Sequence, residues 1–418
     1  MNTAENRGKE REAGRQEAKE GQVRRREFAD GVCLSELGMG AMRLPQTEEG
    51  FAKPIDRAAA KELIDYCMAH GVNYYDTAYI YHGGQSEAFL GRALKKYPRE
   101  SYFVADKFNV QAEPDFEKQF EEQLSRLQRD SIDFYLLHGM TDKLVSDYLD
   151  HGAPEYFLKQ KKAGKIRYFG FSFHGSPEAL RRILSRYPWD FVQIQLNYYD
   201  WFHGTAREQY EILREQNIPI MVMEPVHGGM LADLPGKGGE TLLRLHPEAS
   251  QASWAFRFLR TLPGIAVILS GMSKLEQVKD NIQTFSEPAG LTEQELGAVE
   301  EVSALLHEMY AVPCTGCRYC CADCPQELDI PFLLAAYNEY RTGGEKDLSS
   351  WRLARPRRAA RRKAAVSLYR LRPVYGSLSP GAGRSRLYEG NGGADVKPQS
   401  FIGLEQQVDS QMRADVVQ

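Results

Sequence analysis

Short apolar or aromatic runs alternate with amphipathic stretches from about residue 32 to residue 286. The runs have strand character, and the stretches between them have a helical period and several end in Gly or before Pro. Eight strands that are each followed by a helix predict a closed parallel (β/α)8 TIM barrel, an α/β fold. The eight runs lie at residues 37–44, 72–78, 102–108, 132–139, 166–173, 191–198, 218–225 and 265–271.

A doubly wound open sheet is the alternative arrangement for such an alternating pattern. The dinucleotide-binding version of that fold carries a G-x-G-x-x-G sequence after its first strand, and none follows residues 37–44. The barrel is therefore the favoured fold. Because barrel enzymes carry their active sites at the C-terminal ends of the strands, the polar residues at those ends are the candidates for function.

Composition adds limits on partners and location. The chain has 418 residues, 42% of them apolar, and a formal net charge of -4, so nothing in its overall charge favours a nucleic acid or a membrane as partner. Residues 1–26 interleave acidic and basic side chains without an apolar segment, which predicts a disordered charged extension and not a secretory signal. With no apolar run long enough to cross a bilayer, we expect a cytoplasmic protein.

Four titratable residues lie at or just beyond the ends of consecutive predicted strands. Asp76 ends the second strand, Tyr81 follows it, Lys107 closes the third and His138 closes the fourth. A neighbouring ammonium group stabilises a phenolate and lowers a tyrosine pKa from its ordinary value of about 10, while a carboxylate would hold that lysine in place. The set predicts acid catalysis, although any one such residue could be an ordinary salt bridge or surface group.

These residues stand within motifs that resemble the aldo-keto reductase family over roughly residues 28–345. The resemblance implies a nicotinamide cofactor across the barrel mouth and a small-molecule carbonyl substrate above it. It also implies that Tyr81 donates a proton, that Lys107 and Asp76 tune it, and that His138 orients the carbonyl oxygen. The motifs are DTAYIYHGGQSEAFLG, VADKF, YLLHG, GKIRYFGFS and VILSGMSKLEQVKDNI.

The same resemblance implies cofactor-binding residues, in two groups. Ser172 and Gln193 match the pair that binds the nicotinamide carboxamide, although Phe173 stands where the family has asparagine, and Met223 and Glu224 stand where it often has a stacking aromatic residue. A second group would hold the adenosine end through backbone N–H groups and a helix N-terminus: Ser270, Gly271, Met272, Ser273, Gln277 and Asn281. Lys274 is the local cation for a 2′-phosphate, and both NADP and NAD stay open as cofactors.

A cysteine run follows the barrel. Cys314, Cys317, Cys320 and Cys324, the last followed by Pro325, spell C-x2-C-x2-C-x3-C-P, which predicts a ferredoxin-like 4Fe-4S cluster. The alternative is a structural zinc site, which typically uses two separated C-x2-C pairs. Cys321 is left over by this assignment.

The predicted organisation has four parts: a disordered extension (1–26), the barrel (27–290), a helical segment with the cysteine motif (291–345) and a basic, disordered tail (346–418). The segments CTGCRYC, CPQELDIP and YNEYRTGGEK resemble the branch of the aldo-keto reductase family that carries a C-terminal ferredoxin-like iron–sulfur extension. In that branch a second cysteine run commonly follows, whereas here residues 352–372 hold nine basic residues and no acidic one. Such a block also suits an arm for nucleic acid or an acidic partner, and a reading-frame change after about residue 346 is a third interpretation.

Two functions compete at this stage. The first is an NAD(P)H-dependent reductase of aldehydes or ketones whose iron–sulfur cluster exchanges electrons with a redox protein partner or stabilises the extension. The second is a nucleotide-binding redox sensor or electron-transfer protein that uses the barrel without reducing carbonyls. The set of Asp76, Tyr81, Lys107 and His138 favours the reductase, because a sensor needs no proton donor beside a hydride path.

Overall fold

The computed structural model divides into two units, residues 1–306 and 307–418, which we describe separately. The residues that it describes are 15–16, 21–48, 53–234, 236–288, 290–310, 312, 314, 319–322, 328–334 and 338. The basic tail predicted for 346–418 and most of the predicted 1–26 extension lie outside these residues.

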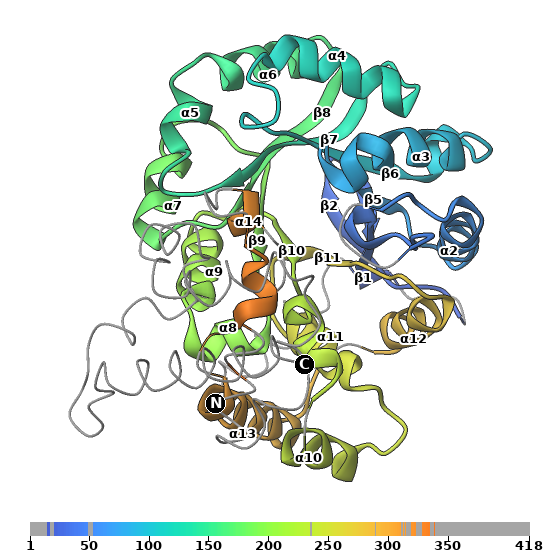
Figure 1. Ribbon diagram of the computed structural model, residues 1–418, viewed down its shortest axis with the longest axis vertical. Helices are drawn as coiled ribbons and strands as arrows, with labels where there is room; N and C mark the ends of the chain where they lie inside the picture. Colours follow the sequence, from blue (N-terminus) through green and yellow to red (C-terminus); the bar gives the residue numbers. More distant parts are fainter. Residues whose placement is uncertain are drawn as a thin grey trace, which may run out of the picture. The chain divides into compact units, whose positions relative to one another are not determined.

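A closed barrel of eight parallel strands forms the centre of the first unit (Figure 1), which confirms the predicted fold class. Each predicted run overlaps one strand, and neighbours in sequence are neighbours in the barrel, with β11 closing the ring between β10 and β4. The strands are β4 (Leu37–Gly40), β5 (Tyr74–Asp76), β6 (Phe103–Phe108), β7 (Ile132–Met140), β8 (Ile166–Phe173), β9 (Phe191–Gln195), β10 (Ile220–Met223) and β11 (Ile265–Ser270).

Helices surround the ring of strands, as Figure 1 shows for α2 to α12. Several of them begin at a side-chain cap that satisfies a free N–H of the first turn; Asp56, Asp115, Ser176 and Ser250 each accept such a hydrogen bond. The helices are α2 (Arg57–Ala69), α3 (Gln85–Leu94), α4 (Phe116–Leu127), α5 (Val145–Leu149), α6 (Ala153–Lys162), α7 (Pro177–Leu184), α8 (Tyr198–His203), α9 (Ala206–Glu215), α10 (Lys237–Leu245), α11 (Gln251–Arg260) and α12 (Leu275–Ser286).

An antiparallel hairpin of β2 (Arg25–Ala29) and β3 (Val32–Ser35) precedes the barrel. Its turn contains Asp30 and Gly31, both at positive φ, which is the chemistry of a tight hairpin. Phe28 packs edge-on against two barrel aromatics, with ring centroids 5.3 Å from Phe134 and 4.9 Å from Tyr168, so the hairpin covers apolar groups of the barrel interior. The domain boundary predicted at residue 26 falls inside β2, which also pairs with β1 (Arg15–Gln16).

The helix α13 (Glu293–Met309) continues the chain after the barrel. Thr292 and Glu295 bond each other at its start, each through its backbone N–H to the other's side chain, which is a capping box. The second unit contains the short helix α14 (Tyr319–Ala322) and an apolar cluster, whose members are Val312, Cys320, Leu328, Ile330, Leu333 and Leu334.

Candidate functional site

Three of the four predicted catalytic residues lie at neighbouring strand ends and are almost fully buried. Asp76 ends β5, Lys107 lies in β6 and His138 in β7, with exposed fractions of 3%, 0% and 3%. The Lys107 Nζ donates to Asp76 Oδ1 at 2.5 Å and to the Thr77 carbonyl oxygen at 2.6 Å. A buried ammonium with a carboxylate and a carbonyl as partners is held in one position.

Tyr81, the fourth predicted catalytic residue, lies beside the other three. It begins the 3-10 segment η2 (Tyr81–Gly84), whose next residue, His82, has φ 51°. The Lys107 Nζ lies 4.9 Å from the centre of the Tyr81 ring, and the His138 ring meets that ring edge-on at 5.8 Å. The structure therefore brings all four residues together, with Lys107 and His138 next to the Tyr81 ring.

The pKa of Tyr81 is raised and not lowered as the sequence suggested. Burial raises the pKa of its hydroxyl well above the usual value, and the carboxylates of Asp76, Glu224 and Asp106 raise it further. The Lys107 Nζ donates its hydrogen bonds to Asp76 and Thr77. Tyr81 accordingly keeps its proton, and the expected lowering of its pKa is not what this arrangement produces.

His138 is held in the neutral form. Burial lowers the pKa of its imidazole well below the usual value, and the nearby positive charge of Lys107 lowers it further. Its Nδ1 lies 3.5 Å from the Asn109 Nδ2. A neutral imidazole at this point can hydrogen-bond to a polar oxygen without adding a second positive charge.

The two residues expected at the nicotinamide carboxamide lie on β8 and β9, which pair side by side with Ser172 opposite Gln193. The Ser172 Oγ accepts a hydrogen bond from the Gly139 N–H at 2.7 Å. The Gln193 Nε2 contacts the Met223 sulfur at 3.5 Å, whereas its buried Oε1 has no hydrogen-bond partner among the described residues. A buried amide oxygen without a partner is costly, so this site suits a ligand that donates an N–H.

The segment after β11 is tied to the start of the barrel. Ser273 Oγ donates to the carbonyl oxygen of Arg43, in the 3-10 segment η1 (Ala41–Arg43), at 2.8 Å. A side chain at Gly271 would lie within 3.5 Å of the Arg43 side chain, so glycine leaves room for that arginine. Met272 is buried. These contacts hold the segment after β11 against η1 at the C-terminal end of the barrel.

Two other predicted residues of the adenosine end lie in α12 and already have hydrogen-bond partners. The Gln277 Oε1 accepts from the backbone N–H groups of Ser273 and Lys274 at 2.8 and 3.1 Å, so its oxygen caps the helix. The Asn281 Nδ2 donates to the Ser270 Oγ at 3.0 Å. Both side chains therefore stabilise the conformation of residues 270–274. Lys274 is exposed.

Sequence reasoning missed Arg43 and gave Glu224 no role. Glu224 follows β10 with φ 55°, and its Oε2 accepts from the Gly228 N–H at 2.7 Å in the 3-10 segment η4 (His227–Ala232). Burial raises the Glu224 pKa, and Arg43 acts against that rise. Their position could have identified them, because both residues lie at the C-terminal ends of predicted strands (37–44 and 218–225), where a barrel carries its functional groups.

The cysteine motif is only partly within the described residues. Cys314 and Cys321 pack against the apolar cluster that contains Cys320, whereas Cys317 and Cys324 lie outside the described part. Within that part no group of three or more residues is arranged to hold a metal ion. Of the other cysteines, Cys67 is buried and burial raises its pKa to about 12, as suits a residue of the core.

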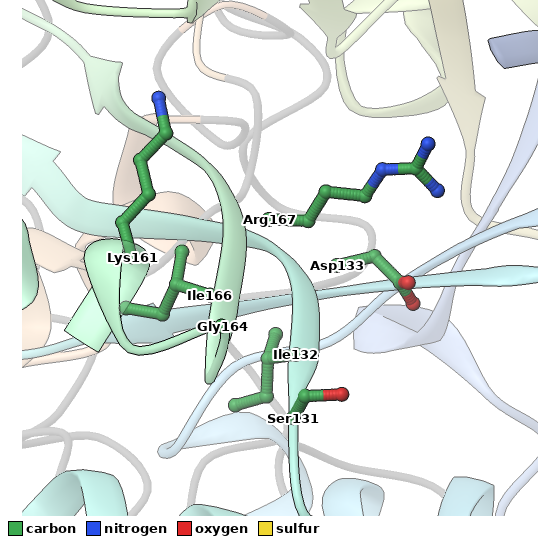
Figure 2. Close-up of a pocket in the computed structure, with 7 residues that line it drawn as sticks. All are labelled: Ser131, Ile132, Asp133, Lys161, Gly164, Ile166 and Arg167. Atoms are coloured by element: carbon green, nitrogen blue, oxygen red, sulfur yellow. The ribbon is translucent and has the colours of Figure 1, made fainter.

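A cavity of about 390 Å³ lies elsewhere in the barrel (Figure 2). Its walls come from the N-terminal ends of β7 and β8 and from the end of α6, so it is at the opposite end of these strands from His138 and Ser172. The lining residues are Ser131, Ile132, Asp133, Lys161, Gly164, Ile166 and Arg167. It is not part of the candidate site.

Comparisons with known proteins agree with this geometry. Residues 36–304 match the model of the Aldo/keto reductase family. The uncharacterized oxidoreductase YqkF of Bacillus subtilis is 25% identical over 300 residues, which cover 64% of this chain and 92% of YqkF. L-galactose dehydrogenase of Arabidopsis thaliana is 27% identical over 306 residues, covering 65% of this chain and 91% of the relative.

A solved structure is similar over the same region. The holo form of the aldo-keto reductase AKR11C1 from Bacillus halodurans is 26% identical, with a TM-score of 0.55, and the match covers 69% of this chain and 96% of that one. Among the described helices of the present chain, none is both long and apolar enough to cross a membrane.

Proposed function

Because this chain belongs to the aldo/keto reductase family of oxidoreductases, we propose that it reduces an aldehyde or ketone to the alcohol, or runs the reverse reaction, with Tyr81 as proton donor. The observation that carries the proposal is the grouping of the Lys107 ammonium and the His138 ring around the Tyr81 ring, at 4.9 and 5.8 Å. The expected location is the cytoplasm, where cysteine thiols stay reduced.

In the proposed reaction, the carbonyl carbon receives a hydride while the Tyr81 hydroxyl passes its proton to the carbonyl oxygen. A bound nicotinamide cofactor supplies the hydride. Lys107 stabilises the phenolate that remains, and Asp76 keeps the ammonium in place. His138, as a neutral ring, orients the carbonyl oxygen by a hydrogen bond. The high pKa of Tyr81 keeps the donor protonated until the oxyanion forms.

The cofactor would be NADP(H) or NAD(H). Gln193 supports this, because its buried Oε1 lacks a partner among the described residues and the carboxamide of nicotinamide offers an N–H donor. Ser172, on the adjacent strand, would bind the same group. At the other end Ser270, Gly271, Met272 and Ser273 would hold the adenosine phosphates, with Asn281 bracing Ser270 and Gln277 capping the helix.

The test mixes purified, anaerobically reconstituted protein with NADPH or NADH and each member of a panel of aldehydes and ketones. Oxidation of the cofactor is then measured. We expect turnover in the wild type and its near-complete loss in Tyr81→Phe, which keeps the aromatic ring and removes the hydroxyl group that donates the proton. Tyr79→Phe, which loses a hydroxyl bonded to Glu122, is the matched control and should keep its rate. No turnover, or equal turnover in Tyr81→Phe, would overturn the proposal.

For the cysteine motif we propose that Cys314, Cys317, Cys320 and Cys324 bind a 4Fe-4S cluster that exchanges electrons with a redox protein partner. The spacing of the four residues supports this. Iron and sulfide analysis with a visible spectrum tests it: Cys320→Ala should lose iron and sulfide, whereas Cys321→Ala should retain both. Bound zinc without sulfide would show a structural zinc site instead.

A further inference from the structure

Behind Lys107, on the side of β6 that faces helices α3 and α4, lies a buried polar network. We propose that Gln123 and Glu87 are positioning residues, which fix the backbone of Lys107 and through it the ammonium group beneath Tyr81. The inference rests on the proposed function, because it assigns these residues a role in that reaction. Within the described part of the chain, neither residue hydrogen-bonds to the side chain of Tyr81, His138 or Asp76.

Gln123, on α4, makes the direct contact. Its Nε2 donates to the carbonyl oxygen of Lys107 at 3.0 Å and to the Glu87 Oε1 at 3.0 Å, and its Oε1 accepts from the Tyr135 hydroxyl. The Gln123 side chain is fully buried. All its donors and its acceptor are thus engaged, so it has a single orientation in the interior.

Glu87, on α3, anchors that glutamine. It is fully buried, and its Oε2 accepts from the Arg126 Nη1 at 2.8 Å. Arg126 in turn reaches the Glu122 Oε2 at 3.1 Å and lies 4.3 Å above the Tyr79 ring. The chain of contacts therefore runs from the protein surface to the backbone of the strand that carries Lys107.

Asp106 completes the network from within β6. Its Oδ1 accepts from the Lys107 N–H at 2.8 Å, so side chains bind both backbone groups of Lys107. The Asp106 Oδ2 is buried and lacks a hydrogen-bond partner among the described residues. Burial and the neighbouring Glu87 raise the Asp106 pKa well above its usual range.

The position of the Lys107 backbone matters because the side chain has little freedom. Its Nζ reaches Asp76 and Thr77 on the adjacent strand end and faces the Tyr81 ring. A small displacement of β6 would weaken all three contacts at once, and a misplacement of about 1 Å near reacting groups can cost about 100-fold in rate. A positioning role therefore predicts a loss of rate without a loss of cofactor affinity.

The experiment compares Gln123→Met, which keeps the length of the side chain and removes its hydrogen bonds, with Gln209→Met as matched control. Gln209 is also a buried glutamine that donates to a backbone carbonyl, that of Gly175, at 3.0 Å. Its side-chain hydrogen bonds go to Gly175 and Thr205 and not to β6. Gln123→Met should lower kcat about 10- to 100-fold, leave the cofactor Kd unchanged and shift the pH profile of kcat. Gln209→Met should do none of these.

Two further readouts separate positioning from general stability. In a Lys107→Met background, Gln123→Met should lower kcat no further, because it acts through that lysine. In protein labelled with ¹⁵N at the lysine side chains, the ammonium signal that disappears in Lys107→Met should shift in Gln123→Met and not in Gln209→Met. This measurement requires no turnover.

An unshifted ammonium signal in folded Gln123→Met would overturn the inference, and so would multiplicative losses of kcat in the double variant. A shifted signal in a protein that reduces no carbonyl would support the link from Gln123 to Lys107 and overturn the proposed function. If turnover requires Tyr81 but Gln123→Met changes neither kcat nor the ammonium signal, the proposed function is supported and the positioning role of Gln123 is overturned.

Discussion

Replacing Lys107 by Met removes a buried charge and leaves its partner behind. The Lys107 side chain is fully buried, and its Nζ lies 2.5 Å from the Asp76 Oδ1. Breaking such a pair by removing one partner costs about 3–5 kcal/mol of unfolding free energy when the other stays charged. Burial already raises the Asp76 pKa, and Lys107 offsets part of that rise. In Lys107→Met the offset is lost, so the Asp76 pKa rises further.

The sign of the pH dependence follows from this shift. Between the unfolded pKa of about 3.9 and the raised folded pKa, the folded state binds more protons than the unfolded state. Unfolding free energy therefore falls as pH rises through that window, by up to about 1.4 kcal/mol per pH unit for one group. Because the window extends to higher pH in Lys107→Met, the variant should lose more stability at pH 8 than at pH 5.

Urea unfolding followed by circular dichroism at the two pH values measures this difference. The double variant Asp76→Asn/Lys107→Met should be more stable than Lys107→Met at pH 8, since it no longer buries an unpaired carboxylate. Equal losses at both pH values, or no recovery in the double variant, would refute the assignment of Lys107 and Asp76 as a buried ion pair.

Three other substitutions test the packing and the charges of the barrel. Gly91→Ala should cost about 1–3 kcal/mol despite the better helix propensity of alanine, because its Cβ would lie 2.5 Å from the Leu127 carbonyl oxygen; a stability gain in thermal unfolding would contradict this. Asp106→Asn should flatten the fall of unfolding free energy with rising pH, because burial raises the Asp106 pKa in the folded state; an unchanged slope in urea titrations would show that the group is ionised. Glu36→Gln should cost about 3–5 kcal/mol, because Glu36 is a buried partner of Arg260 at 2.9 Å; a loss below about 1 kcal/mol in urea unfolding would mean a weak pair.

The sequence was sufficient to predict the barrel, because eight runs of strand character alternate with helices and the side chains at the strand ends follow from that alternation. This is why Asp76, Lys107 and His138 could be placed together before the structure was known. The hairpin over the end of the barrel was missed, since its first strand, residues 25–29, reads RREFA and carries a single large apolar side chain, Phe28.

Other features depend on contacts between distant segments. The pKa of Tyr81 reflects burial together with carboxylates from three different strand ends, which no local pattern reveals. The network behind Lys107 joins α3, α4 and β6 through Gln123 and Glu87, residues that lie in amphipathic stretches and look like ordinary surface positions. Gln277 caps its own helix, because free N–H groups at a helix start compete for a nearby amide oxygen.

Transfer of a deuteride from labelled nicotinamide to a carbonyl compound tests the central claim most directly. Protein is incubated with NADPH or NADH deuterated at the reactive carbon, and the alcohol is analysed by mass spectrometry. We predict one deuterium on the former carbonyl carbon with the wild type, and almost no labelled alcohol with Tyr81→Phe that still binds the cofactor. Unlabelled alcohol, or equal labelling by Tyr81→Phe, would contradict hydride transfer assisted by Tyr81.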